Sequence, residues 1–131
     1  MKLLLDTHIW VWSLLEPARL TRRVARALED EENELWLSPI SVWELLVLVE
    51  KGRLTLDLPV EQWIERAMKA GALKEAPITQ EVALETRKVA LPHRDPADRF
   101  IAATARVFDL TLVTADRNLL ALRGLSTLPD R

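Results

Sequence analysis

The chain begins MKLLLDTHIWVW (residues 1–12), where a short apolar run is followed directly by an acid, Asp6. The run from Lys2 to Leu5 has the length and composition of a buried strand, and the apolar stretch from His8 to Leu15 predicts a mostly buried helix. The same order of strand, acid and helix occurs again in LTLVTADRN (residues 110–118). Strands that alternate with helices in this way predict βαβ units and a parallel sheet.

Between these two stretches the alternation continues, without an internal repeat, a low-complexity segment or a flexible linker. We expect an α/β fold. Further strands are expected at 34–37, 73–76, 110–113 and, as an edge strand, 125–128. Helices are expected at 21–30, 38–52, 59–70, 79–91, 96–108 and 116–124.

The composition limits what the chain can be. With 131 residues, of which 49% are hydrophobic, it can bury one sizeable core, and we expect a single domain over residues 1–131. The absence of cysteine excludes disulfides and thiolate sites and suits a reducing compartment, so a cytoplasmic location is expected. No apolar stretch approaches a signal-peptide core or a membrane span, which predicts no membrane partner.

Several enzyme classes are excluded by what the sequence lacks. Its three glycines, Gly52, Gly71 and Gly124, each stand where a helix should end, so there is no P-loop and no dinucleotide-binding loop. No serine lies in a nucleophile-elbow context. The segment after the first strand also lacks the second aspartate that an aspartyl-phosphate phosphatase would carry.

Four acids lie in otherwise apolar segments: Asp6, Glu44, Asp98 and Asp116. Asp6 and Asp116 directly follow strands, where ligands bind in a parallel sheet, and the other two lie on helices that such a sheet could carry to the same end. Gathered carboxylates raise one another's pKa values, and oxygen-only sites suit Mg²⁺ or Mn²⁺. The pattern therefore predicts a divalent cation in a shared pocket of the kind found in nucleases.

A structural role for the same acids is also open, because helix starts favour aspartate. Asp116 is a plausible N-cap, and Asp95, just before Pro96, is a better one that would leave Asp98 in the first turn. Glu44 differs, since its neighbours are apolar and a buried, unpaired carboxylate costs several kcal/mol. It needs a partner, for which metal-bound water or an arginine would serve.

Other side chains carry weaker signals. His8 and His93 are too far apart in the sequence to indicate a metal site, and we expect both at the rim of the pocket, with His8 able to contact substrate. Among the tryptophans, Trp36, Trp43 and Trp63 fit core faces, while Trp10 and Trp12 are expected in the core or at a partner interface. Arginines at 19, 22, 23 and 26 cluster on one helix, and Arg94, Arg99 and Arg117 flank the acids.

Four stretches, taken together and in this order, resemble the PIN-domain family, specifically the VapC-type toxins of toxin–antitoxin pairs. They are LLLDTHIWVW, then LSPISVWELLVL with KGRL after it, LPHRDPADRFIAATA, and LTLVTADRNLL. The resemblance covers essentially the full chain. No one of these stretches would be specific alone.

The resemblance implies a three-layer α/β/α domain around a mainly parallel sheet of four to five strands, acting as a Mg²⁺- or Mn²⁺-dependent endoribonuclease that a cognate antitoxin inhibits. By position, Asp6, Glu44, Asp98 and Asp116 match the family's catalytic acids, with Asp6, Asp98 and Asp116 expected to hold metal. Thr114 matches a hydroxyl residue near that centre, and Asp95 an extra acid typical of the HRDP subgroup. Arg94, Arg99, Arg117 and His8 are expected to contact RNA, and a homodimer is expected.

Two alternatives remain open from the sequence. In one, the chain keeps the PIN shape as a non-catalytic interaction module whose acids serve caps and salt bridges. In the other, it is a nuclease for DNA or for a particular nucleic-acid structure, with the same acidic site and a different groove.

Overall fold

A computed structural model describes residues 1–92 and 95–131. The strands are β1 (Lys2–Leu5), β2 (Glu34–Leu37), β3 (Lys74–Glu75), β4 (Thr111–Thr114) and β5 (Thr127–Pro129). The α-helices are α1 (Thr7–Leu15), α2 (Arg22–Glu29), α3 (Pro39–Glu50), α4 (Val60–Ala70), α5 (Gln80–Glu85), α6 (Pro96–Val107) and α7 (Arg117–Leu120). Two short 3₁₀ helices, η1 (Pro17–Arg19) and η2 (Thr86–Lys88), complete the described elements.

The strands form one parallel sheet in the order β3-β2-β1-β4-β5. The first strand is therefore central, and Leu4 pairs in register with Trp36 on one side and Leu112 on the other. Successive side chains of a strand point to opposite faces, so β1 places Leu3 and Leu5 in one core cluster and Leu4 in the other. Both faces of β1 are buried, which explains its uninterrupted run of leucines.

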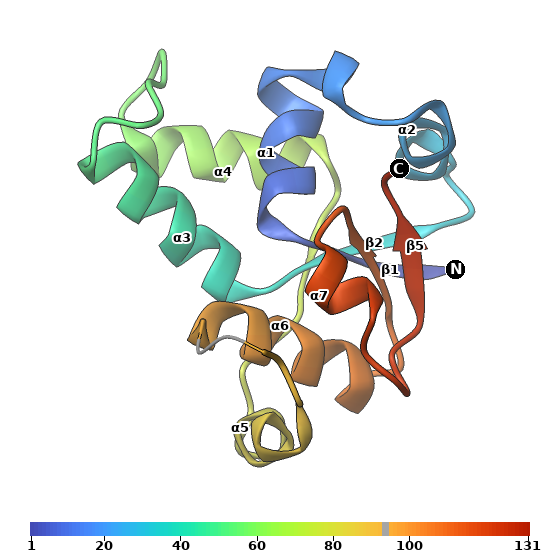
Figure 1. Cartoon of the computed structure of the whole chain (residues 1–131). Coiled ribbons are helices and arrows are strands. Elements are labelled where there is room, and N and C mark those ends of the chain that lie inside the picture. Colours follow the sequence, from blue (N-terminus) through green and yellow to red (C-terminus); the bar gives the residue numbers. More distant parts are fainter. Residues whose placement is uncertain (93–94) are drawn as a thin grey trace.

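Helices cover both faces of the sheet (Figure 1). Helices α1, α2 and α4 lie on one face, with Trp10, Val24 and Trp63 in the core cluster there. Helices α5 and α6 lie on the other, where Val82 and Ile101 are buried. The structure confirms the α/β fold and the three-layer arrangement around a parallel sheet. No helix in residues 1–92 or 95–131 has both the length and the apolar character needed to cross a membrane.

Some expected element bounds were wrong. The helix expected at 79–91 ends at Glu85 and continues only as the short 3₁₀ helix η2. The chain leaves the helix there because Val89 turns into the core, where it is 2% exposed, and its amide donates to Thr86 O at 3.2 Å. The helix expected at 116–124 likewise spans only Arg117–Leu120, and the edge strand lies at Thr127–Pro129 rather than 125–128.

The tryptophans divide differently from the sequence prediction. Trp10 and Trp63 are buried and their ring centroids lie 5.9 Å apart, whereas Trp43, expected in the core, is 54% exposed. Helix α3 buries the side that carries Ser41 and Leu45, and Trp43 lies two positions from each, on the opposite side. The prediction for Trp43 was wrong because a helix that is apolar on all sides has no periodicity to indicate which face is buried.

Candidate active site

A pocket of about 370 Å³ lies at the carboxyl ends of the two central strands, β1 and β4. The starts of α3 and α6 lie side by side next to it (Figure 1). Its lining includes all four acids singled out in the sequence, together with Asp95 and His8: Asp6, His8, Ile9, Trp12, Glu44, Asp95, Asp98, Ala115 and Asp116. The structure thus brings into one pocket acids that are spread over more than a hundred positions of the sequence.

Asp6 is held where β1 passes into α1. Its amide donates to Val113 O of the neighbouring strand at 3.0 Å, which fixes the backbone. Its Oδ1 accepts from the Thr7 amide at 2.9 Å, and its Oδ2 accepts from Thr114 Oγ1 at 2.7 Å. Burial raises the pKa of Asp6, and the hydrogen bonds from Thr114 and Thr7 oppose that rise. Thr114 therefore lies beside the acids, as the resemblance implied, and its hydroxyl helps Asp6 to ionise.

Glu44 projects from α3 and is hydrogen-bonded by the Thr7 hydroxyl. Since that hydroxyl has a single proton, the contact of 2.8 Å between Thr7 Oγ1 and Ser41 Oγ must have Ser41 as donor. Burial raises the pKa of Glu44, and repulsion from Asp6 and Asp95 adds to the effect. The partner that Glu44 required is thus a threonine rather than an arginine. The sequence signal for Thr7 was its place directly after Asp6, but only the fold brings it to Glu44.

Asp95 and Asp98 reach the pocket from the first turn of α6. Asp95 is the N-cap and accepts from the Ala97 amide at 3.0 Å. Burial raises the pKa of Asp98 to about 7, and repulsion from Asp95, from Asp6 and from the other two acids adds to it. Because such repulsion falls off with distance, these carboxylates act on one another across the same space.

Asp116 caps the last helix, α7. Its Oδ1 accepts from the amides of Asn118 and Leu119 at 2.8 and 3.1 Å, and its own amide donates to Thr114 Oγ1 at 3.0 Å. The expected capping roles of Asp95 and Asp116 are therefore both present in the structure. They do not remove these acids from the pocket, because capping uses Oδ1 of each residue while the side chain still lines the wall.

The carboxylates share the pocket without forming a tight cluster. Within residues 1–92 and 95–131, no three side chains of histidine, cysteine, aspartate or glutamate are close enough to hold one metal ion by direct contact with all three. The acidic side chains that line the pocket all offer carboxylate oxygens, the ligand type that Mg²⁺ and Mn²⁺ prefer.

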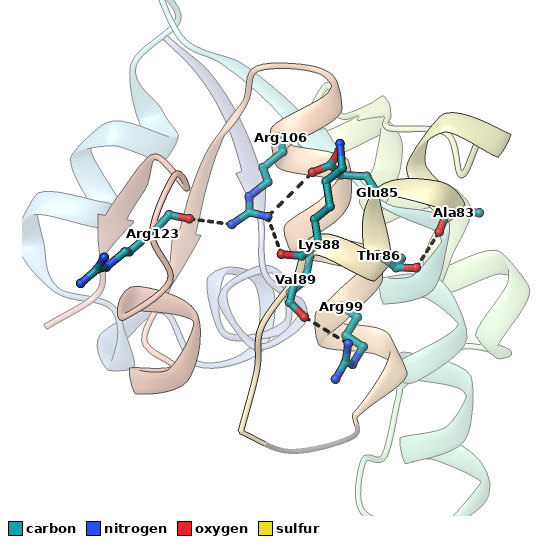
Figure 2. Close-up of polar contacts among 8 residues, drawn as sticks. All are labelled: Ala83, Glu85, Thr86, Lys88, Val89, Arg99, Arg106 and Arg123. Carbon is teal, nitrogen blue, oxygen red and sulfur yellow. Dashed lines mark hydrogen bonds and ion pairs between the residues drawn. The ribbon is translucent and has the colours of Figure 1, made fainter.

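The cationic side chains expected near the acids lie in different places. Arg99 does not line the pocket, and its Nη1 donates to Val89 O at 3.1 Å, tethering the segment before α6 (Figure 2). Arg117 is exposed on the first residue of α7, next to Asp116. Arg94, like His93, lies outside the described residues.

Two rings border the acids on the side of α1. His8 is exposed and lines the pocket, with its ring centroid 5.7 Å from that of Trp12. The Arg19 guanidinium also lies over the Trp12 ring, 4.4 Å from its centroid. Sequence reasoning placed Arg19 only in a basic helix cluster, because its contact with Trp12 depends on the turn through η1.

Comparison with known proteins places the chain in a family. A model of the PIN domain matches residues 3–125. The chain is 40% identical over 119 residues to ribonuclease VapC22 of Mycobacterium tuberculosis, covering 88% of both chains. Its fold resembles VapBC2 from Rickettsia felis bound to a promoter DNA fragment, with a TM-score of 0.75 at 18% identity over 98% of each chain. FitAcB from Neisseria gonorrhoeae matches with a TM-score of 0.63 at 25% identity, over 98% of this chain and 97% of that one. The chain therefore belongs to the PIN-domain family, within its group of VapC ribonucleases.

Proposed function

We propose that this chain is a metal-dependent endoribonuclease and the toxin of a toxin–antitoxin pair, with Asp6, Glu44, Asp98 and Asp116 as its catalytic acids. The observation that carries the proposal is the gathering of carboxylates from five positions of the sequence in one pocket, where burial and mutual repulsion raise the pKa of Asp98 to about 7. A fold that gathers like charges loses stability by doing so, which points to a bound positive charge. The relationship to ribonuclease VapC22 supports the same activity.

The pocket suits Mg²⁺ or Mn²⁺. Mg²⁺ gives up its water reluctantly and is commonly held by one or two carboxylates with several waters retained, so a site without three converging ligands still fits it. The volume of about 370 Å³ exceeds by several-fold the roughly 30 Å³ of one water molecule, which leaves room for a hydrated ion. Asp6, Asp98 and Asp116 would hold it, directly or through water. When bound, such an ion lowers the pKa of a coordinated water and neutralises charge on phosphate.

The chain's own residues would prepare this centre. Thr114 and Thr7 donate hydrogen bonds that favour the ionised forms of Asp6 and Glu44. Glu44 would orient the attacking water. His8, which lines the pocket, and Arg117, which is exposed next to Asp116, would contact an RNA phosphate near the acids, so binding would weaken as salt rises. In Arg99, by contrast, one guanidinium nitrogen is engaged with Val89 O.

The proposed partners follow from the group to which the chain belongs. Solved relatives include a toxin–antitoxin complex from Klebsiella pneumoniae and DNA-bound VapBC from Salmonella typhimurium, and we infer a cognate antitoxin for this chain as well. Exposed Leu14 and Leu15 on α1 offer apolar contact for it. We also propose a homodimer, a cytoplasmic location consistent with an RNA target, and membership of the HRDP subgroup, for which the sequence motif at residues 93–96 is the support.

The test is RNA cleavage by Asp98→Asn beside a matched control, Asp109→Asn. Both variants remove one negative charge at an end of α6, but Asp109 is exposed at the far end, where asparagine tolerates its positive φ of 53°. With Mn²⁺ present, the wild type and Asp109→Asn should cleave RNA, and Asp98→Asn should be more than about a hundredfold slower. Equal rates for all three proteins would refute the assignment of the site.

The same assay separates the alternatives. A non-catalytic module would cleave nothing, and Mn²⁺ would leave its melting temperature unchanged, because an ion that does not bind the folded state cannot stabilise it. A DNA-directed nuclease would cut single-stranded DNA faster than RNA of the same sequence at equal salt. Chelation with EDTA should abolish cleavage in either nuclease.

A further inference from the structure

A second hollow, of about 140 Å³, lies directly beside the acidic pocket. His8 and Glu44 stand in the walls of both. Apart from Thr7, the remaining side of the second hollow is of a different chemical kind, since it is lined by one large aromatic ring, two aliphatic side chains and two cations: Trp43, Val47, Leu48, Lys51 and Arg53. The acidic pocket thus adjoins a second hollow whose wall is partly aromatic and basic.

The division follows from the geometry of α3. Trp43, Val47 and Lys51 are spaced by four residues, so they form one stripe along the helix and its end. Glu44 is one position further on and therefore turned by about 100° around the axis, into the acidic pocket. One helix therefore carries a catalytic acid on one side and an exposed indole, 54% accessible, on the adjacent side.

The two cations are held by the turn that ends α3. Gly52 has a φ of +69°, which a glycine adopts without strain. Around it the amides of Lys51, Gly52 and Arg53 donate to Val47 O, Val49 O and Leu48 O at 3.0, 3.1 and 3.0 Å. The backbone of this KGR turn is thus fixed by three hydrogen bonds. Among the residues that the structure describes, neither Lys51 nor Arg53 forms an ion pair with a carboxylate.

We propose that this hollow is a nucleotide subsite, in which the Trp43 ring stacks on a base next to the cleaved phosphodiester while Lys51 and Arg53 bind the flanking phosphates of a single-stranded RNA. The inference rests on the proposed function and states how the protein would hold its RNA substrate beside the acids. Exposed aromatic rings beside cationic side chains are the usual means of holding a single strand without base-pair recognition. The hollow shares His8 and Glu44 with the acidic pocket, so a base seated there would have its phosphate near the acids.

Charge favours RNA over a protein partner at this surface. The core of a protein interface is depleted of charged residues and of lysine in particular, whereas here Lys51 lines the hollow together with the exposed ring. Trp12, on the other side of the acids, is a poorer platform because His8 and Arg19 already lie against its ring. Among the tryptophans, Trp43 is therefore the one with the most surface to offer a base.

The experiment measures binding of the full chain to a labelled oligoribonucleotide of about twelve nucleotides, in EDTA so that no cleavage occurs. Trp43→Leu, which keeps apolar bulk without a π face, should raise the dissociation constant about tenfold. The dissociation constant of Trp43→Phe should stay within about threefold of wild type. The same RNA in a duplex should show no dependence on Trp43, because its bases are already stacked.

A double variant tests the two cations. Lys51→Ala combined with Arg53→Ala should reduce the slope of log affinity against log salt by about 1.4, since each phosphate contact to a single strand contributes about 0.7. Lys74→Ala is the control, because Lys74 lies over Trp36 at the β3 edge of the sheet, away from the acids. It should leave the slope unchanged.

Failure of this inference is distinguishable from failure of the proposed function. If the wild type cleaves RNA but Trp43→Leu binds and cleaves as well as wild type, the subsite is wrong and the nuclease stands. If Trp43→Leu instead dissociates a dimer in sedimentation with unchanged RNA affinity, the surface is an interface between copies. If the wild type neither binds nor cleaves RNA, both proposals fall.

Discussion

The two ends of helix α6 use charge in opposite ways. At its start, Asp98 shares a pocket with four other carboxylates, and its pKa is raised to about 7. Near its end, Arg106 is surrounded by acceptors: its Nη1 donates to Lys88 O at 3.3 Å and lies 3.8 Å from Glu85 Oε2, and its Nη2 donates to Arg123 O at 2.6 Å (Figure 2). The start of α6 brings like charges together, and its end places a cation among hydrogen-bond acceptors.

The difference separates a group kept for chemistry from one kept for stability. The Arg106 guanidinium ties η2 and the segment after α7 to α6, so its contacts hold three parts of the chain together. The acids at the other end hold nothing together by attraction to one another, and their proximity costs free energy unless a cation is present. Removing a charge should therefore have opposite consequences for stability at the two ends of α6.

The largest effect on stability is expected for Arg106→Ala. The backbone carbonyls of Lys88 and Arg123 lose a charged donor, and Glu85 keeps only its ion pair with Lys88, so the free energy of unfolding should fall by about 2 kcal/mol. Denaturant titration measures the loss, and RNA cleavage per folded molecule should stay within about twofold of wild type. A variant as stable as wild type would mean that the guanidinium contacts contribute nothing net.

Thr114→Val should chiefly affect activity. It keeps the shape of the side chain but removes the hydroxyl that donates to Asp6 Oδ2, so the pKa of Asp6 should rise further. The cleavage rate near neutral pH should fall about tenfold, with its pH profile shifted to higher pH. Thr114→Ser, which retains the donor, is the control. Matching profiles for valine and serine would show that the hydroxyl is not used.

The dependence of stability on pH should reveal the repulsion at Asp98. Its pKa is raised from the model-peptide value of 3.8 to about 7, so the folded state binds the proton more tightly than the unfolded chain. Stability should therefore fall as the pH rises from about 4 to 7, by about 1 kcal/mol after allowance for solvent screening. In EDTA, the free energy of unfolding of Asp98→Asn should fall less over this pH range than that of the wild type. Identical curves for the two proteins would exclude the raised pKa.

The smallest effect is expected for Glu85→Gln. The ion pair with Arg106 is 3.8 Å long and both side chains are partly accessible, so the loss should be about 0.5 kcal/mol or less. Thermal melting of this variant beside Arg106→Ala compares the pair with the carbonyl contacts. A loss as large as that of Arg106→Ala would mean that the ion pair, rather than the carbonyls, anchors the guanidinium.

The parts of the fold that depend on local sequence could be predicted. Asp6 and Asp116 follow buried strands, and their place at the strand ends could be inferred because parallel strands end at one edge of a sheet. The caps at Asp95 and Asp116 were equally local. The resemblance to the PIN domain supplied the layers and the roles of the acids, which the spacing alone left open.

What depends on distant packing could not be predicted. The partner of Glu44 is a hydroxyl 37 positions away, and nothing in the neighbourhood of either residue indicates the pairing. Arg99, expected to face RNA, is engaged with Val89 O because the 79–91 segment leaves its helix early. Trp43 was misplaced since α3 is apolar on nearly every side and its sequence does not show which side is buried against the neighbouring helices.

The hydrogen bond from Thr114 to Asp6 joins residues 108 positions apart, across the pairing of the first strand with the fourth. A ribosome that adds roughly 5 to 20 residues per second needs on the order of ten seconds to reach the second of them after the first. During synthesis β1 therefore lacks its β4 neighbour until Thr111–Thr114 has been made, and the nascent polypeptide cannot bring Asp6 and Asp116 together before then. The long-range pairing of β1 with β4 therefore delays the assembly of the acidic pocket relative to the synthesis of its first residues.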